Sequence, residues 1–203
     1  TGYRLPKADV LAEMFSLAEN TLCPLEEVLA ERFPYFERVG GQIQHIRQVY
    51  EEKKRETNSV DFDDLLALPV RLLKEHEALR ERFQRQFQFV LVDEFQDTNL
   101  LQCELIDLLA GPNGNLMVVG DDAQSIYSWR GADVGNILNF HERYPKARIH
   151  KIETNYRSVP QVLELANAVI AQNEAQIRKE LKAARPEGAM LPALVALDSP
   201  AAQ

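Results

Sequence analysis

The chain has 203 residues, of which 45% are hydrophobic and 27% charged, and its formal net charge is −8. This composition is typical of a globular protein with one large domain, or one domain and part of another. The negative charge argues against broad electrostatic binding of nucleic acid, although a groove that stacks bases on aromatic rings needs no basic surface. No apolar run approaches the roughly 20 residues of a membrane span, and the cysteines and histidines lack the spacing of a zinc site. We expect a cytoplasmic protein without a membrane partner.

Residues 1–58 are predicted to be helical. Pro24 stands where a helix can begin, because proline is tolerated in the first helical turn. Gly40-Gly41 interrupts the apolar pattern, and a second helix is predicted to follow over 42–56. The apolar residues expected on one side of these helices are Leu25, Val28, Leu29, Ile43, Ile46, Val49 and Tyr50.

The segment "DFDDLLALPVRLL" predicts another helix that begins at residue 61. Asp61 and Asp64 have the spacing of an N-cap residue and the third residue of the helix. Pro69 is expected to kink this helix or to end its first part, because proline removes a backbone donor. The leucines expected to face inward are Leu65, Leu66, Leu72 and Leu73.

From Phe87 onwards the pattern changes to short apolar runs that are typical of buried strands. Three are predicted, at 87–92, 115–119 and 148–152. A helix that stops at Gly111 separates the first two, and a helical stretch at 133–143 separates the second from the third. This alternation at intervals of about 30 residues predicts an α/β fold with a parallel sheet flanked by helices.

Polar side chains follow each predicted strand. Asp93-Glu94 follows the first strand, Asp121-Asp122 the second, and the segment 153–157 the third. An aspartate after a strand can simply begin a turn, but ligands of an open α/β sheet bind beyond the carboxyl ends of its strands. Three strand ends rich in carboxylate, amide and guanidinium groups therefore favour a site for a cation and a polyphosphate.

Three long motifs carry a resemblance to a known family. They are "VDEFQDT" at 92–98, "VVGDDAQSIYSWRGA" at 118–132 and "TNYRS" at 154–158. In this order and spacing they closely resemble the UvrD/PcrA/Rep family of superfamily 1 DNA helicases, and the likeness covers roughly residues 50–175. The resemblance implies a P-loop NTPase (RecA-like) fold with an N-terminal helical segment. "VDFDDLL" at 60–66 resembles the segment by which the family's chain re-enters its first RecA-like domain.

The resemblance implies ATP and Mg²⁺ as cofactors and a role for each strand end. Asp93 binds Mg²⁺, directly or through water, and Glu94 is the base that deprotonates the attacking water. Gln124 senses the γ-phosphate, which Arg157 also contacts to spread the developing charge. Tyr156 stacks on the adenine. Beside these, the resemblance and the chemistry leave Gln96 and Asp97 as supporting partners, with a plain turn role equally open for Asp97.

The segment "QSIYSWRGA" places two aromatic side chains soon after Gln124. In the family, Tyr127 and Trp129 line the track of the single strand, and Arg130 beside them belongs to the same expected DNA contact. Trp129 is the better candidate for base stacking, and the alternative is that this single tryptophan belongs to the core. For Tyr127 the two alternatives are equally open.

The sequence departs from the family in one respect. A P-loop needs the pattern G-x-x-x-x-G-K-[ST], but none of the nine glycines is followed by Lys. We therefore expect an internal part of a longer helicase that is inactive alone. Its predicted parts are a helical insertion at 1–58, the second half of the first RecA-like domain at 59–158, and a helix with a linker at 159–203.

The leading functional hypothesis is part of an ATP-dependent DNA helicase that moves 3′ to 5′ along single-stranded DNA in repair or replication. Its expected partners are single-stranded DNA and duplex junctions, and no protein partner is indicated. One alternative keeps the motor but attaches it to a nuclease, as in RecB/AddA-like relatives. The other is a non-catalytic nucleic-acid-binding module without a P-loop, against which the intact Asp93, Glu94, Gln124 and Arg157 argue.

Overall fold

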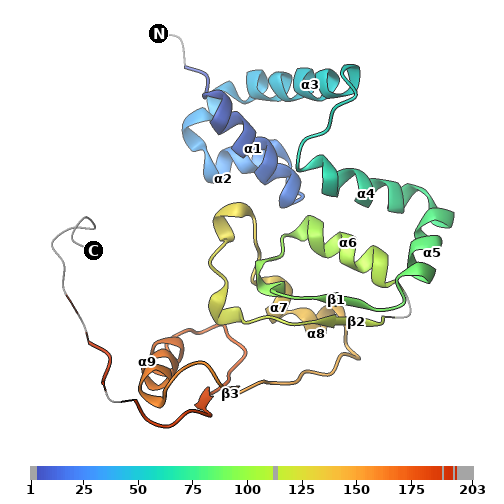
Figure 1. The fold of residues 1–203 in the computed structure, drawn as a ribbon. Helices are drawn as coiled ribbons and strands as arrows, with labels where there is room; N and C mark the ends of the chain where they lie inside the picture. The colour runs from blue at the N-terminus through green and yellow to red at the C-terminus, as the bar shows by residue number, and fades with distance from the viewer. Residues whose placement is uncertain (1–3, 112–113, 189, 194, 196–203) are drawn as a thin grey trace. The chain divides into compact units, whose positions relative to one another are not determined.

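The computed structural model describes residues 4–111, 114–188, 190–193 and 195. The chain divides into two compact units, residues 1–137 and residues 138–203 (Figure 1). This division does not decide the predicted boundaries at 58/59 and 158/159, which stay a prediction.

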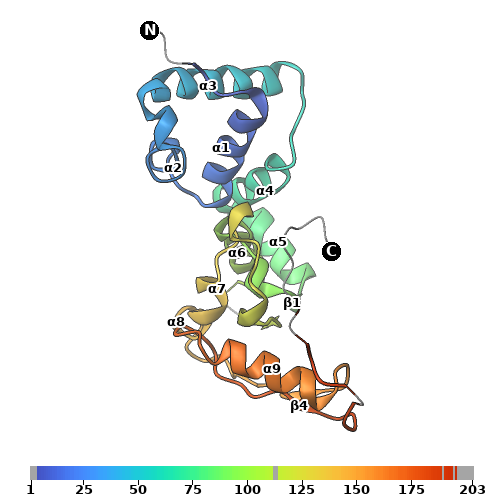
Figure 2. The same cartoon turned by 90° about the vertical axis from the view of Figure 1, so that its left-hand side faces the viewer.

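The first unit begins with helices, as predicted. They are α1 (Ala8–Asn20), α2 (Leu25–Arg32), the 3₁₀ helix η1 (Pro34–Val39) and α3 (Gly40–Glu56). Figure 2 shows α1, α2 and α3 grouped together, and apolar side chains from all of them share one core. The buried members of this core are Met14, Ala18, Leu25, Val28, Leu29, Val39 and Ile43.

The glycine pair at 40–41 does not interrupt the helical region, so this prediction was wrong. Instead α3 begins at Gly40. The first four N–H groups of a helix have no partner within the helix, so glycines at this end cost less than they would in its interior. The predicted helix over 42–56 is otherwise present.

The next helices are α4 (Asp64–Glu75), α5 (Glu77–Gln86) and α6 (Leu100–Ala110). Asp61 and Asp64 exchange hydrogen bonds, each backbone N–H donating to the other carboxylate at 2.9 Å. The helix nevertheless begins at Asp64 and not at the predicted residue 61, and Asp63 occupies the N-cap position. The helix α4 continues through Pro69. Leu73 is buried, but Leu65 and Leu72 are exposed, because only part of the wide apolar face of α4 is covered.

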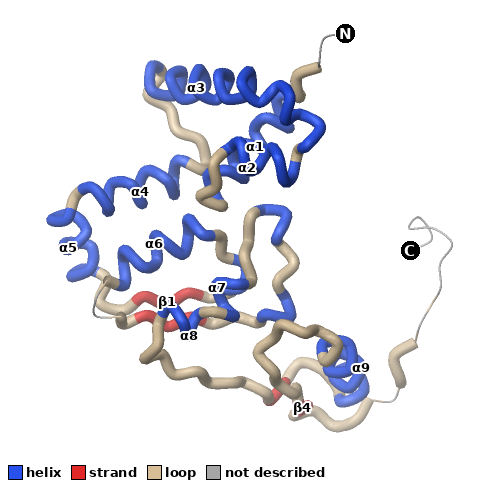
Figure 3. The backbone as a smooth tube through the Cα atoms, turned by 180° about the vertical axis from the view of Figure 1, so that it is seen from behind, coloured by secondary structure: helices blue, strands red, loops and turns tan. Residues whose placement is uncertain are grey.

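The predicted first two strands form a parallel pair. β1 (Val90–Val92) and β2 (Leu116–Val118) align Leu91 with Met117, and α6 lies along the pair (Figures 1 and 3). A reciprocal cap between Asn99 and Gln102 begins α6, and Gly111 ends it at a φ of 59°. This β–α–β arrangement brings the carboxyl ends of β1 and β2 to the same edge.

The second unit contains α8 (Phe140–Arg143), β3 (Thr154–Asn155), α9 (Pro160–Ile170) and β4 (Lys182–Ala183), while the one-turn helix α7 (Gly135–Leu138) crosses the unit boundary. β3 and β4 are parallel, with α9 between them in sequence. The predicted strand at 148–152 is absent, and Ile152 is 77% exposed. Residues 148–152 include apolar side chains, but a strand also needs a neighbouring backbone with which to pair. The pairing with β4 begins only at Thr154.

The observed architecture therefore combines helices with two small parallel sheets. It agrees with the predicted α/β class, while the single three-stranded sheet is not found among the described residues. No helix in that part of the chain is long and apolar enough to cross a membrane.

Candidate functional site

The ends of β1 and β2 are joined beyond the last paired residues. The N–H of Val119 donates to the carbonyl of Val92 at 2.8 Å, and the N–H of Phe95 donates to the carbonyl of Val119 at 2.9 Å. Two short 3₁₀ helices follow, η2 (Phe95–Asp97) after β1 and η3 (Asp122–Gln124) after β2. The two predicted polar segments are therefore brought together.

Glu94 has an unusual backbone conformation. Its φ of 52° and ψ of 41° lie in the left-handed region, which few residues other than glycine adopt. Its N–H donates to Oδ1 of Asp93 at 2.9 Å, and both side chains are exposed. Residues held in such conformations cost roughly 1–3 kcal/mol and cluster at functional sites. Leu22 and Asn58 have a similar positive φ, so the conformation supports a functional role for Glu94 only together with its position at the end of β1.

A chain of hydrogen bonds connects Glu94 with Gln124. The amide Nε2 of Gln96 donates to Oε2 of Glu94 at 2.8 Å, and the Oε1 of Gln96 accepts from the N–H of Asp121 at 2.9 Å. Nε2 of Gln124 then donates to Oδ2 of Asp121 at 2.8 Å. The structure therefore brings Glu94 and Gln124 into one polar network.

Asp97 also belongs to this network, because its Oδ2 accepts from Gln96 at 3.2 Å. The geometry agrees with the supporting role that the sequence left open beside a plain turn role.

Asp93 offers an exposed oxygen ligand of the kind that suits a hard cation. Among the described residues, no three His, Cys, Asp or Glu side chains gather into a metal cage. Mg²⁺ bound together with a nucleotide uses one or two carboxylates, phosphate oxygens and waters. The oxygen donors at the end of β1 fit that mode of binding.

The aromatic segment lies directly after η3. Trp129 belongs to the 3₁₀ helix η4 (Ser128–Arg130) and is 63% exposed, so it is not the core tryptophan that the sequence left as an alternative. Tyr127 is 39% exposed. Gly131 ends η4 at a φ of 84°, a conformation that favours glycine. The side chain of Arg130 lies outside the described part of the structure.

Tyr156 and Arg157 belong to the second unit, directly after β3. Tyr156 is 77% exposed. Oδ1 of Asn155 accepts from the N–H groups of Arg157 and Ser158 at 2.9 and 2.8 Å, which holds the turn before α9. The structure describes this segment by itself, so the predicted convergence of three strand ends stays a prediction.

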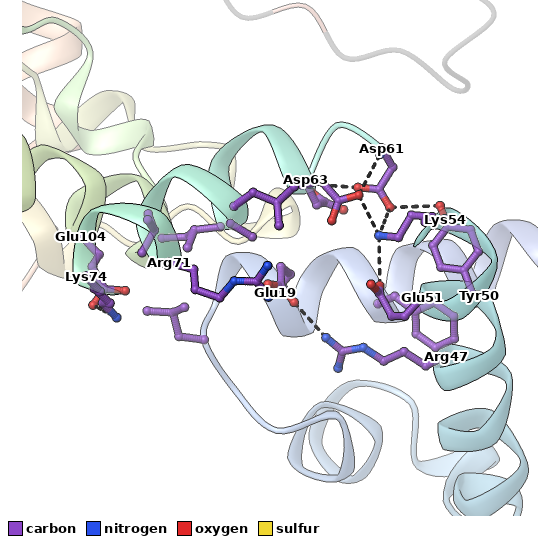
Figure 4. A pocket seen from close by; sticks show the side chains of 17 residues that line it. Glu19, Arg47, Tyr50, Glu51, Lys54, Asp61, Asp63, Arg71, Lys74 and Glu104 are labelled. Carbon is purple, nitrogen blue, oxygen red and sulfur yellow. Dashed lines mark hydrogen bonds and ion pairs between the residues drawn. The ribbon is translucent and has the colours of Figure 1, made fainter. Parts of the chain in front are cut away.

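A pocket of about 370 Å³ lies elsewhere in the first unit and contains none of the predicted site residues (Figure 4). Lys54 of α3 lines this pocket. Its Nζ lies within 3.0 Å of a carboxylate oxygen of Glu51, Asp61 and Asp64. Burial lowers the pKa of Lys54, but the hydrogen bonds to these carboxylates outweigh it and raise the pKa above its usual value. This Lys54 cluster ties the end of α3 to the start of α4.

The same cluster changes the acidity of Asp61 and Tyr50. Burial opposes ionisation of Asp61, yet the hydrogen bond from Lys54 outweighs it and lowers the pKa of the carboxyl group. The pKa of Tyr50 is raised, first by burial and then by its hydrogen bond to Asp61. Lys54 and its three carboxylates are held by contacts within the fold, and we assign this pocket a structural role.

Sequence reasoning missed the strain at Glu94 and the Lys54 cluster. Left-handed geometry at a glutamate leaves no periodic pattern. The pair of Lys54 with Glu51 has the local i,i+3 spacing, but its pairs with Asp61 and Asp64 depend on how α3 and α4 pack. The Gln96 link had a partial signal, since a glutamine so close to two carboxylates needs donors and acceptors to satisfy it.

Comparison with known proteins gives an independent result. The model of the UvrD/REP helicase N-terminal domain matches residues 6–145. Among curated proteins, the chain is 43% identical over 152 residues to the ATP-dependent DNA helicase Rep of Salmonella typhimurium, covering 75% of this chain and 23% of that protein. It is 40% identical over 173 residues to the ATP-dependent DNA helicase PcrA of Bacillus subtilis, covering 85% and 23%.

A third relative, the PcrA protein of Leuconostoc citreum, is 44% identical over 139 residues, or 68% of this chain and 19% of that protein. The chain therefore spans about a fifth of the length of the curated relatives it matches.

Proposed function

Because the chain belongs to the UvrD/REP helicase N-terminal domain family, we propose that it is part of an ATP-dependent DNA helicase that moves 3′ to 5′ on single-stranded DNA. The matched relatives bear the name ATP-dependent DNA helicase. The proposed substrates are ATP and single-stranded DNA next to duplex junctions, and the fold is that of a P-loop NTPase. The process served is DNA repair or replication.

The proposal rests above all on the hydrogen-bonded path from Glu94 through Gln96 and Asp121 to Gln124. Glu94 accepts a proton from the water that attacks the γ-phosphate. Gln124 contacts that phosphate and begins the segment that carries Trp129. The proposed phosphate contact at Gln124 and the proposed DNA contact at Trp129 are then successive parts of one segment.

Asp93 holds Mg²⁺ in this proposal, and the ion supplies charge neutralisation for the phosphate oxygens. One carboxylate oxygen of Glu94 accepts from Gln96, which would orient the other oxygen for proton transfer. An oriented base is more effective because the reacting atoms need no further ordering.

Exposed aromatic rings supply the proposed DNA contact. Trp129 presents most of its indole to solvent, and base stacking on such a ring is worth about 1–3 kcal/mol per base. Stacking needs no positive charge, which agrees with the net charge of −8. Tyr127 and Arg130 are proposed to support the same contact.

For the second unit, we carry over the roles that the resemblance implies. Arg157 stabilises charge on the γ-phosphate as it develops, and Tyr156 stacks on adenine. The exposure of Tyr156 leaves its ring accessible to a base.

The test uses the full-length protein that contains these residues. It should hydrolyse ATP in the presence of Mg²⁺, faster with oligo(dT) than without, and should unwind a duplex with a 3′ overhang but not one with a 5′ overhang. The 203-residue chain is the matched control, and it should show no DNA-stimulated hydrolysis because its glycines include no P-loop pattern.

Two results would contradict the proposal. A full-length protein that binds DNA but never hydrolyses ATP would favour the non-catalytic module. Robust hydrolysis by the 203-residue chain that survives the Glu94→Gln substitution would overturn the assignment of the site.

A further inference from the structure

Gln96 is a polar side chain that is almost completely buried, with only 1% of its surface exposed. Every polar atom of its amide is used. Nε2 donates to Oε2 of Glu94 at 2.8 Å and to Oδ2 of Asp97 at 3.2 Å, and Oε1 accepts from the N–H of Asp121 at 2.9 Å. Its backbone carbonyl accepts from Oγ of Ser125 at 3.3 Å.

Among the side chains of this size, an amide satisfies these neighbours best. Two carboxylates on one side require a donor, and a backbone N–H on the other side requires an acceptor. A glutamate would place a third negative charge beside Glu94 and Asp97, and an apolar side chain would leave the partly buried N–H of Asp121 without this partner.

The end of β2 is packed tightly against this amide. A Cβ atom at Gly120 would lie 2.6 Å from Oε1 of Gln96, 2.8 Å from Cδ1 of Ile137 and 3.2 Å from the backbone nitrogen of Phe95. Such distances leave no space for a side chain. The end of β2 therefore lies this close to Gln96 because residue 120 is a glycine.

The aromatic segment is attached to the same place at both ends. At its start, Asp121 holds both Gln96 and the side chain of Gln124. At its end, the N–H of Asp133 donates to the carbonyl of Thr98 at 3.1 Å, and Nδ2 of Asn136 donates to the same carbonyl at 2.9 Å. The loop that carries Trp129 thus begins and ends on residues 96–98.

We infer that Gln96 is the positioning residue that couples Glu94 to the DNA-contacting segment 121–133. The inference rests on the proposed function and adds a specific route to it. When DNA binding moves segment 121–133, Asp121 moves with it. The hydrogen bond from the Asp121 N–H to Gln96 transmits this movement to the amide. The amide in turn reorients the carboxylate of Glu94, to which it donates. Gln96 itself does not contact the substrate, so it acts through Glu94.

The test compares Gln96→Glu with wild type in the full-length protein. ATP turnover is measured with and without oligo(dT), alongside binding of a fluorescent ATP analogue, binding of oligo(dT) and thermal unfolding. The loss of a hydrogen bond to a charged group corresponds to a fall of about 10- to 100-fold. We expect that fall in DNA-stimulated turnover, a smaller one in unstimulated turnover, and unchanged affinity for oligo(dT).

Gln96→Met is the second variant, because it keeps the length of the side chain and adds no charge. Gln96→Met should reduce DNA stimulation in the same way. It replaces Gln96→Glu in the test if the added negative charge prevents that variant from folding. Gln84→Glu is the matched control. Nε2 of Gln84 donates to the carbonyl of Leu108 at 2.7 Å, so this control removes a similar bond outside the site and should lower stability without changing the ratio of stimulated to unstimulated turnover.

The outcomes separate this inference from the proposed function. Folded Gln96 variants that retain the wild-type ratio would overturn the coupling while the helicase proposal stands. A ratio that falls only in proportion to lost DNA affinity or lost stability would also overturn it, because that is the result of a purely structural role. A wild-type protein without any DNA stimulation would overturn the proposed function and the coupling together.

Discussion

The chain contains two β–α–β arrangements whose strand ends are held very differently. After β1 and β2, the buried amide of Gln96 donates to Glu94 and accepts from Asp121, and the backbone of Glu94 is left-handed. After β3, one Asn155 side chain holds the turn, and Tyr156 projects with 77% of its surface exposed. The first strand end therefore has more polar support within this chain than the second.

The difference shows that similar sequence signals can have unequal structural support. Both strand ends carry residues that the family motifs mark, yet in the described part of the chain a buried polar side chain supports the first alone. Catalytic groups need such support, because a misplaced general base loses much of its effect. A residue that contacts a flexible phosphate chain through a long guanidinium side chain needs less.

The largest expected effect is at the first strand end. Glu94→Gln in the full-length protein removes the proposed base but keeps an oxygen that can accept the hydrogen bond from Gln96. ATP turnover should fall on the order of 10²–10⁴-fold while nucleotide binding persists. Steady-state turnover together with nucleotide binding measures this. Turnover close to wild type would show that Glu94 is not the base.

A somewhat smaller effect is expected at the second strand end. Arg157→Ala should reduce turnover by roughly 10²–10³-fold, since one group that stabilises developing charge is lost. Arg157→Lys is the control, because it keeps the charge but not the planar fork, and it should recover only part of the activity. Equal activity of the alanine variant and the wild type would remove Arg157 from the site.

A substitution of Trp129 tests the role of the aromatic segment, which lies between β2 and β3 in sequence. Trp129→Ala should weaken binding of oligo(dT) by about 1–3 kcal/mol in the full-length protein, and Trp129→Phe should weaken it less, because a ring remains for stacking. Titration at low salt gives the affinities.

The same residue can be tested in the chain itself, where it is the only tryptophan. Acrylamide should quench its fluorescence readily, as expected for an indole that is 63% exposed. A shielded indole would contradict the proposed contact with DNA.

The Lys54 cluster provides a test of stability apart from the site. Lys54→Met leaves Asp61 and Asp64 without their cation and should lower the free energy of unfolding by about 1–2 kcal/mol, between the values of exposed and buried pairs. Denaturant unfolding of the chain measures this. Lys53→Met is the control, because Lys53 pairs with Glu56 on an exposed surface and should have little effect.

The smallest effect concerns pH. The lowered pKa of Asp61 means that its contribution to stability is present above the unfolded pKa, about 3.9, and is lost as pH falls through the folded value. The stability difference between wild type and Lys54→Met should therefore shrink at acid pH. The raised pKa of Lys54 affects stability at alkaline pH. The contribution of Lys54 to stability is fully present below its unfolded pKa, about 10.4, and is lost as pH rises through the folded pKa. A difference that stays constant down to acid pH would contradict the ion pairing.

The sequence by itself determined the features that are local. The hydrogen-bonded pair of Asp61 and Asp64 beside the start of α4 follows from side chains three residues apart, and the stop of α6 follows from Gly111, which can adopt a positive φ. The polar residues after β1 and β2 could be read directly, and the motifs indicated the family. These signals survive in sequence because each depends on neighbours within one turn or one strand.

Only the tertiary structure decided which distant residues meet. Gln96 and Asp121 are 25 positions apart, and nothing in the local pattern of either indicates the other. The missing strand at 148–152, the exposure of Trp129 and the partners of Lys54 likewise depend on which backbone or side chain lies alongside. Apolar alternation records how a segment is buried, whereas hydrogen bonds between segments are set by the packing that brings them together.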